Sequence, residues 1–316
     1  MQKRLKILVV RFSSIGDIVL TSPVVRVLKK QINAEVHFLT FLRYSDIVSV
    51  NPNIDKVHTI QKNIREIIKV LKKEQFDLLV DLHHNIRTQF LKFQLRIPVK
   101  SVSKLNLQKW LRTTFKINIL PNVHIVDRYL DTIKHLGVIN DNLGLDFFLT
   151  DDDEVENLQG EYIVFAIGGT HNTKKLPTQK IINICKKINQ PIILIGGKED
   201  FKNGKLIVSA AKNTQNFCGK YSVGQSAFII KNAKYIITHD TGMMHVAAAF
   251  RKKIYSIWGN TIPGFGMTPY LSNPDSKIIE VENLSCRPCT KIGFAQCPKG
   301  HFNCMNKIDE SLFLNE

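Results

Sequence analysis

Residues 239–250, HDTGMMHVAAAF, place an acid, a hydroxyl and a histidine at the start of a short apolar run. The preceding residues are rich in β-branched side chains, so Asp240, Thr241 and Gly242 are expected at a strand-to-helix turn. Free backbone N–H groups and the helix dipole attract an anion there, and a diphosphate would fit. His245 lies one turn beyond Thr241 and faces the same way. The alternative is an ordinary capped helix with a buried histidine.

A second polar turn lies within RFSSIGDIVLTSP, which follows the apolar run ILVV. Ser13, Ser14 and Gly16 form a small loop, and Asp17 stands at the entry of the next expected helix. A carboxylate there can cap the helix, or it can accept a proton from a substrate hydroxyl in a closed, dry site. The loop lacks the GxGxxG pattern and the chain lacks GxxxxGK[ST], so neither familiar phosphate-binding motif explains it.

The elements that must position these residues alternate between short apolar strands and stretches with helical spacing, which is typical of parallel α/β sheets. This alternation continues through the first half of the chain, is interrupted by the acidic stretch TDDDEVENLQG, and resumes at YIVFAIGG. We therefore expect a first Rossmann-like domain at 1–150, a linker at 151–160 and a second domain at 161–316. Two such domains are expected to face each other across a cleft, with ligands at the carboxyl ends of the strands.

The amino-acid composition limits which classes of protein and which kinds of partner are compatible with the chain. The chain has 316 residues, and 44% of them are hydrophobic, which excludes a disordered or fibrous protein. Its formal net charge is +17. Residues 1–150 carry 24 lysines and arginines against 12 acidic residues, so the first half is expected to meet the more anionic partner. The apolar run near the start is too short for a signal peptide, and no later stretch is long enough to span a membrane. A cytoplasmic protein is expected.

Between Leu82 and Val126 there is no acidic residue, while basic and aromatic side chains recur. The basic residues singled out are Arg87, Lys92, Arg96 and Lys100. This combination suits a phosphorylated amphiphile or a membrane surface, and the alternative is a solvated basic face. Nucleic acid is not expected as a partner, because no nucleic-acid-binding motif accompanies the charge.

Taken together, ILVVRFSSIGDIVLTSPVVRVLKK and DTGMMHVAAAF with IYSIWGNTIP resemble the ADP-heptose:lipopolysaccharide heptosyltransferases of glycosyltransferase family 9. The resemblance covers most of the chain in domain order. It implies a GT-B fold of two Rossmann-like domains, with the donor nucleotide in the second. It also implies inverting, metal-independent transfer of a sugar from a nucleotide diphosphate, ADP-heptose in this family, to a lipid-linked inner-core acceptor. The protein would then lie peripherally on the cytoplasmic face of the inner membrane.

Residue by residue, the resemblance makes Asp17 the base that deprotonates the acceptor hydroxyl, with the 13–16 loop on the acceptor side. The 240–245 turn becomes the donor-diphosphate loop, Lys174 the lysine that meets the donor phosphates, and Glu199 an acid against the ribose, a role that Asp200 could also fill. Where the family shows a pair of hydroxyls before the lysine, this chain has THNT. The substitutes there are Thr170, His171 and Thr173.

Four of the six cysteines gather near the carboxyl terminus: Cys286, Cys289, Cys297 and Cys304. In a cytoplasmic protein disulfides are not expected, which leaves a structural Zn²⁺, with His301 as a spare ligand, or reduced thiols. The first pair has a good chelating spacing and the second is loose. Catalysis is expected to need no cofactor.

Two other functions remain open at this point. A sugar-nucleotide epimerase can share the two-domain architecture, but it would not need a lipid acceptor, so the acid-free basic segment favours transfer. A non-catalytic anion-binding module would be driven by the net charge alone.

Overall fold

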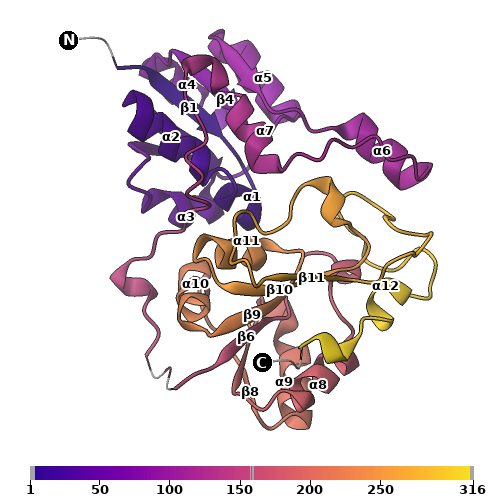
Figure 1. Ribbon diagram of the computed structural model, residues 1–316. Helices are drawn as coiled ribbons and strands as arrows, with labels where there is room; N and C mark the ends of the chain where they lie inside the picture. The colour runs from indigo at the N-terminus through magenta and orange to yellow at the C-terminus, as the bar shows by residue number, and fades with distance from the viewer. Residues whose placement is uncertain (1–3, 157, 159, 314–316) are drawn as a thin grey trace. The chain divides into compact units, whose positions relative to one another are not determined.

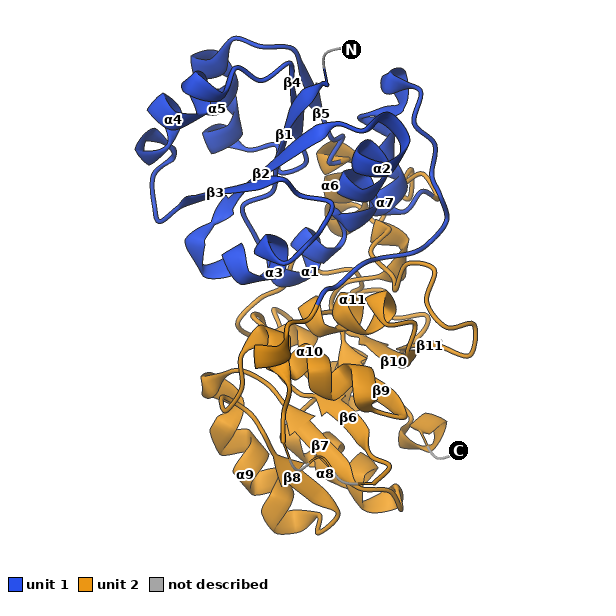
Figure 2. Cartoon of the chain, turned by 90° about the vertical axis from the view of Figure 1, so that its left-hand side faces the viewer, with its two compact units in different colours: residues 1–104, 123–148 blue, residues 105–122, 149–316 orange. Residues whose placement is uncertain are grey.

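The computed structural model describes residues 4–156, 158 and 160–313. The chain divides into two compact units, shown in different colours in Figure 2. Unit 1 comprises residues 1–104 and 123–148, and unit 2 comprises residues 105–122 and 149–316. Each unit is built around its own parallel sheet, as the alternating pattern predicts (Figure 1).

Unit 1 contains a five-stranded sheet in the order β3-β2-β1-β4-β5, with every pairing parallel. The strands are β1 (Lys6–Val10), β2 (Glu35–Phe41), β3 (Lys56–Ile60), β4 (Leu78–Asp81) and β5 (Val99–Ser101). Because the order reverses between β1 and β4, the loops that follow these two strands diverge and leave room for a ligand at their carboxyl ends. The loop after β1 contains Asp17.

Helices cover both faces of this sheet, as the blue unit in Figure 2 shows. They are α1 (Ile15–Val19), α2 (Ser22–Ile32), α3 (Ser45–Ser49), α4 (Ile68–Glu74), α5 (Ile86–Leu95) and α7 (Ile125–Asp131). One core contains Leu8, Leu39 and Leu79 from the sheet and Leu71 and Leu91 from α4 and α5. The opposite face is covered by α2, which also contacts α7.

Unit 2 contains a six-stranded parallel sheet in the order β11-β10-β9-β6-β7-β8. The strands are β6 (Ile163–Ala166), β7 (Ile192–Ile195), β8 (Thr214–Asn216), β9 (Tyr235–His239), β10 (Lys253–Trp258) and β11 (Lys277–Glu280). The helices are α6 (Asn106–Thr114), α8 (Thr178–Lys187), α9 (Phe201–Ala210), α10 (Val223–Asn232), α11 (Gly242–Ala249) and α12 (Asn303–Asn306). Here the order reverses between β6 and β9, which places the loops containing Lys174 and Asp240 next to each other.

The observed division differs from the predicted one at two places: residues 149–160, expected as the end of the first domain and a linker, group with unit 2, and so does an internal segment. Residues 105–122 were expected in the first domain, but their contacts group them with unit 2. Lys116 Nζ donates to the carbonyls of Cys286 and Pro288 at 3.3 and 2.8 Å, and so fastens this segment to the carboxyl-terminal tail. The acid-free stretch at 82–126 is therefore shared between the two units. Among the described residues, no helix combines the length and hydropathy needed to cross a membrane.

Candidate active site

Asp17 lies in the first turn of α1, directly after the loop that leaves β1. Its carboxylate accepts hydrogen bonds from the backbone N–H of Ser14 at 3.2 Å and from the Ser14 hydroxyl at 2.9 Å. The other oxygen lies 2.6 Å from Arg11 Nη2. Arg11 also donates to the carbonyl of Leu82, at the end of β4, so the guanidinium bridges the two diverging strand ends. The carboxylate is thereby held at the switch point of the sheet.

The charge state of Asp17 follows from these contacts. Burial by itself would raise the pKa of Asp17, but the positive charge of Arg11 and the hydrogen bonds from Ser14 outweigh it, so the pKa lies below its ordinary value. The side chain remains 23% exposed. Asp17 is therefore an accessible, ionised carboxylate at neutral pH, as a proton acceptor must be.

Two further polar side chains lie close to Asp17 and were not identified from the sequence. Burial, and then the charge of Arg11, lower the pKa of His83 to about 4. Its buried Nδ1 atom has no hydrogen-bond partner. Burial raises the pKa of Tyr129 to about 12, and charged groups close to it include Arg11 and Asp17. His83 is thus a neutral imidazole whose buried Nδ1 atom is unpaired.

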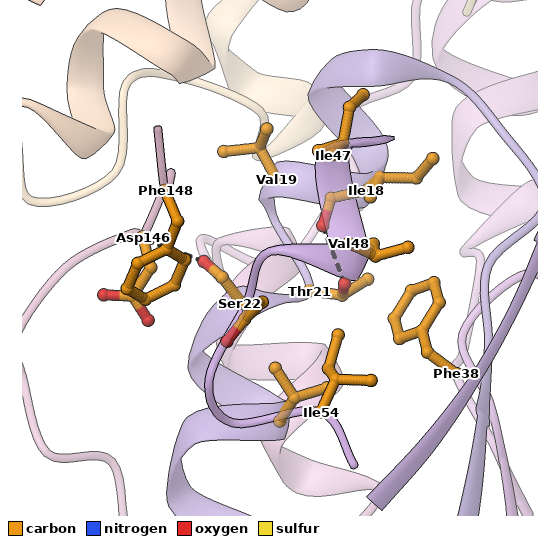
Figure 3. A pocket seen from close by; sticks show the side chains of 12 residues that line it. Ile18, Val19, Thr21, Ser22, Phe38, Ile47, Val48, Ile54, Asp146 and Phe148 are labelled. Atoms are coloured by element: carbon orange, nitrogen blue, oxygen red, sulfur yellow. Dashed lines mark hydrogen bonds between the residues drawn. The ribbon is translucent and has the colours of Figure 1, made fainter. Parts of the chain in front are cut away.

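Apolar side chains pack beneath α1, the helix that contains Asp17 (Figure 3). Ile18 and Val19 line a cavity of about 10 Å³, together with residues from β2, α3 and the 146–148 segment. This volume holds at most about one water molecule, so the cavity is a packing defect rather than a substrate site. The Ser22 hydroxyl at its edge accepts from the backbone N–H of Asp146 at 2.8 Å and ties the start of α2 to that segment.

Unit 1 also carries an open basic hollow at the carboxyl ends of β2 and β3. Its volume is about 400 Å³, and it is lined by Phe41, Leu42, Arg43, Gln61, Lys62 and Arg87. The guanidiniums of Arg43 and Arg87 lie 5.5 and 5.6 Å from the centre of the Phe41 ring. Three cations and no carboxylate line this hollow, so it suits an anionic group.

The corresponding edge of unit 2 is organised by an ion pair. Lys174, in the loop after β6, places Nζ 2.6 Å from Asp240 Oδ2 in the loop after β9. The Thr261 hydroxyl donates to the same Asp240 oxygen at 2.8 Å. Asp240 therefore fixes the lysine ammonium beside the N-terminus of α11. Lys174 and the 240–245 turn, each predicted from the resemblance to meet the donor diphosphate, thus lie next to each other.

Several polar atoms around this ion pair lack partners. Thr241 is the N-cap residue of α11, yet its hydroxyl makes no capping hydrogen bond, and the buried Oγ1 atom has no other partner. Asn260, in the loop after β10, is 2% exposed, and neither polar atom of its side chain has a partner. Gly169 approaches this region so closely that a Cβ there would lie 3.1 Å from Thr241 Cγ2. Buried atoms of this kind are costly unless a ligand satisfies them.

The remaining predicted donor residues have different environments. Glu199 is exposed in the loop after β7, whereas Asp200 is buried and pairs with Lys175 at 3.1 Å. Of the two acids, Glu199 is therefore the one available to a ligand. Thr170 is exposed, but the hydroxyl of Thr173 is bonded to the backbone of Phe294 and has a structural role.

His245 and His239 are both buried in the core beneath this edge. His245 is 3% exposed on α11, and Gly242 begins that helix. His239 was not identified from the sequence; its Nε2 accepts from the backbone N–H of Leu176 at 2.9 Å. Burial lowers the pKa of His239 to about 3, so it is a neutral acceptor that holds the loop containing Lys174.

The comparisons with known proteins agree with this arrangement of strands and loops. The family model described as glycosyltransferase family 9 (heptosyltransferase) matches residues 64–298. The chain belongs to glycosyltransferase family 9. Lipopolysaccharide heptosyltransferase 1 of Campylobacter coli is 24% identical over 289 residues, which cover 81% of this chain and 84% of the relative.

Solved structures of heptosyltransferases share the fold. A family 9 glycosyltransferase from Veillonella parvula superposes on this chain with a TM-score of 0.80 at 20% sequence identity. The superposition covers 99% of this chain and 96% of the Veillonella chain. The ADP-heptose lipopolysaccharide heptosyltransferase II of Escherichia coli superposes with a TM-score of 0.72 at 19% sequence identity. This superposition covers 98% of this chain and 99% of the E. coli chain. The predicted GT-B fold and the enzyme class, a glycosyltransferase, are confirmed, and the family match decides against the epimerase and binding-module alternatives.

In this family 9 glycosyltransferase the carboxyl-terminal tail orders the loop after β10. The buried Arg287 donates to the carbonyls of Trp258, Gly259 and Thr261, and it pairs with Glu280 at 2.7 Å. The tail thus holds Asn260 and Thr261 beside the Lys174–Asp240 pair. Arg287 was not among the tail residues predicted from the sequence, which were the four cysteines and His301.

The four cysteines of the tail are close enough to influence one another's pKa values, but their sulfur atoms do not form a compact cluster. Burial raises the pKa of Cys304 to about 12, and the other three thiols add to the rise. No three cysteine sulfurs among the described residues lie within 4.8 Å of one another. The sulfurs are therefore farther apart than zinc ligands would be, and the zinc site stays a prediction.

The basic residues of the acid-free segment also differ in role. Lys92 is engaged inside unit 1, where Nζ lies 2.8 Å from the buried Asp81 and donates to Ser101. Arg96 and Lys100 are exposed, and Arg87 lines the basic hollow. Lys92 is thus a structural residue and does not add a free charge to the surface.

Proposed function

We propose that the chain transfers a heptose from ADP-heptose to an inner-core acceptor of lipopolysaccharide, with inversion and without a catalytic metal ion. One observation carries the proposal: the Lys174 ammonium lies 2.6 Å from Asp240, next to the unpartnered Thr241 hydroxyl at the start of α11. A cation, a hydroxyl and a helix N-terminus together suit a diphosphate. The E. coli structure that shares this fold is named for ADP-heptose.

The donor diphosphate becomes the leaving group, so charge grows on it during transfer. Lys174, Thr241 and the free backbone N–H groups of α11 stabilise that charge, and Asn260 supplies a further donor. Glu199, exposed after the neighbouring strand, accepts from the ribose hydroxyls. Because a lysine and a helix N-terminus neutralise the diphosphate, no divalent cation is needed for this step.

Asp17 supplies the other half of the reaction. The acceptor hydroxyl oxygen attacks the anomeric carbon as the bond from that carbon to the diphosphate breaks on the opposite face, which inverts the configuration. The hydroxyl proton passes to Asp17, whose orientation is fixed by Arg11 and Ser14. A carboxylate with a low pKa is a weak base, so the proton moves as the new bond forms and the hydroxyl becomes acidic.

The acidic stretch Asp151–Asp153 supports metal-independent chemistry. It forms one 3₁₀ turn, in which Asp153 accepts hydrogen bonds from the backbone N–H of Thr150 at 3.0 Å and from its hydroxyl at 3.2 Å. Asp153 is therefore used as a cap. This is the role of a solvated turn and not that of a DxD motif that holds a metal–diphosphate complex.

The acceptor is anionic and lipid-linked, and two features of the surface suit it. The hollow that contains Arg43, Lys62 and Arg87 suits a phosphate or carboxylate of the inner core. Helix α6 exposes Leu107 by 63% and Trp110 by 51%, beside basic residues of the same helix. An amphipathic helix of this composition binds the interface of an anionic membrane. The protein would then work peripherally at the cytoplasmic face of the inner membrane.

The proposal is tested by incubating the protein with ADP-heptose and a lipid-linked inner-core acceptor and measuring the mass of the product. The expected product is the acceptor enlarged by one heptose, with ADP released in equal amount. UDP- and GDP-linked sugars serve as matched donors and should give little product. Equal use of all the donors, or donor consumption without change in the acceptor, would contradict the proposed substrates.

A further inference from the structure

A second cluster of functional side chains lies at the opposite edge of the unit 1 sheet. His37 is near the start of β2, His58 is on the neighbouring β3, and Glu74 is the last residue of α4. Leu39 pairs with His58 in the register of these strands, so His37 and His58 lie on the same face, the one covered by α4. The carboxyl ends of the strands, which carry Asp17, are at the other edge.

The two imidazoles are buried and directed at each other. His37 is 2% exposed and His58 is 3% exposed, and His37 Nδ1 lies 2.9 Å from His58 Nε2. On its other side, His37 Nε2 lies 2.9 Å from Glu35 Oε1. Since a carboxylate accepts, Nε2 of His37 carries the hydrogen, and Nδ1 presents a lone pair toward His58. One proton therefore occupies the space between two nitrogen atoms.

Glu74 completes the group from the helix side. Its Oε2 atom lies 4.0 Å from His37 Nδ1, and one ligand atom from each of the three residues lies within 4.8 Å of the others. Lys56 pairs with the other Glu74 oxygen, and Lys6 lies 3.1 Å from Glu35 and 3.4 Å from Glu74. Each lysine therefore keeps an acidic partner when Glu74 Oε2 turns toward the imidazoles.

We propose that His37 Nδ1, His58 Nε2 and Glu74 Oε2 form a binding site for a divalent cation of the zinc class, separate from the catalytic edge. The cation replaces the proton between the two imidazoles, and His58 moves that proton to its Nδ1 atom. Tetrahedral ligands with bonds of about 2.1 Å are about 3.4 Å apart, so the two rings separate by about 0.5 Å on binding.

The chemistry of the donor set selects the metal. Two imidazoles and one carboxylate suit Zn²⁺ and Co²⁺ better than Mg²⁺ or Ca²⁺, which prefer oxygen ligands. Glu35 has the position of an outer-shell residue, because it fixes the tautomer of a ligating histidine through the opposite ring nitrogen. A bound ion would join β2, β3 and the end of α4, and so stabilise unit 1 against unfolding.

Co²⁺ titration of the full-length, metal-free protein tests the site. The expected result is one cobalt ion bound with visible d–d bands that lack thiolate charge transfer, which separates this site from the cysteines. His37→Gln and His58→Gln should each lose these bands, whereas His135→Gln, at an exposed histidine, should keep them. Glu35→Gln should retain the bands with affinity lowered about 10- to 100-fold.

Thermal unfolding gives an independent measurement. A Zn²⁺ concentration one hundred times Kd should raise Tm by about 5 °C in the wild type and in His135→Gln, but not in His58→Gln. If the histidine variants fail to fold, Glu74→Gln, which preserves size, should fold and lose most of the cobalt affinity. Cobalt bands that are unchanged in the folded variants, or that consist of thiolate charge transfer alone, would overturn the proposal.

Discussion

Arg11 and Asp17 form an ion pair, with Nη2 2.6 Å from Oδ1, across the loop that follows β1. Arg11 is itself held by the carbonyls of Ser13 and Leu82. The backbone of two strand ends therefore sets the position of the guanidinium, and the guanidinium sets both the orientation and the charge of the carboxylate. The proposed base is thus preorganised before any substrate arrives.

The ion pair predicts how the rate depends on pH. Burial raises the pKa of Asp17, and Arg11 opposes this effect, so Arg11→Gln should let the pKa rise. Since the base works only when ionised, the acid limb of the kcat/KM profile should move to higher pH in this variant. Arg65→Gln, at an exposed arginine of unit 1, is the control. An acid limb at the same pH in all three proteins would show that Asp17 does not govern it.

Lys174 should contribute to donor affinity through the diphosphate. Lys174→Met should raise the Kd for ADP about tenfold or more, because a hydrogen bond to a charged group is lost. Lys174→Arg keeps the charge and should recover part of the affinity. Lys202→Met removes an exposed lysine of α9 and should bind ADP normally. Calorimetric titration measures all four proteins, and equal affinities would remove Lys174 from the donor site.

Asn260 should show opposite effects on stability and binding. Both polar atoms of its buried side chain lack partners, so Asn260→Leu should raise Tm of the ligand-free protein by about 2 °C or more. The same variant should bind ADP more weakly, because a donor to the ligand is lost. Asn232→Leu, on an exposed position of α10, should change neither quantity. A lower Tm with unchanged ADP binding would assign Asn260 a purely structural role.

Membrane association should depend on α6. In flotation with anionic vesicles, replacing Leu107 and Trp110 by serine should reduce the bound fraction severalfold, because both side chains are exposed and apolar. Leu206→Ser alters a leucine of α9 that is 57% exposed and should have no effect. Arg96→Glu with Lys100→Glu should weaken binding further at low salt. Unchanged flotation of both sets of variants would exclude both segments from membrane binding.

Much of the fold could be predicted from the sequence, because alternating apolar strands and helical stretches specify parallel α/β sheets. The turns with Asp17 and Asp240 were found because each follows a recognisable strand. The sequence does not give the order of strands in the sheet, so it could not place His83 beside Asp17. The pattern DLHHN, polar residues directly after a strand, is the signal that could have found His83.

Other parts of the site depend on contacts between distant segments. Arg287 orders the loop that contains Asn260 through carbonyls that lie 26 to 29 residues earlier in the chain. No local sequence pattern predicts these contacts. Likewise, Lys92 was counted with the free basic residues, because its pairing with Asp81 requires α5 to pack against the end of β4. Segment 105–122 was predicted to belong to the first domain because it lies in the first half of the chain, whereas its contacts group it with unit 2.

The central claim is that Asp17 is the base for heptose transfer. Asp17→Asn preserves the size of the side chain and removes its ability to accept the proton. Measured with ADP-heptose and a lipid-linked acceptor, its kcat should fall at least about 100-fold while the Kd for ADP is unchanged, with Asp46→Asn as the control at an exposed acid. Wild-type turnover by folded Asp17→Asn would contradict the account.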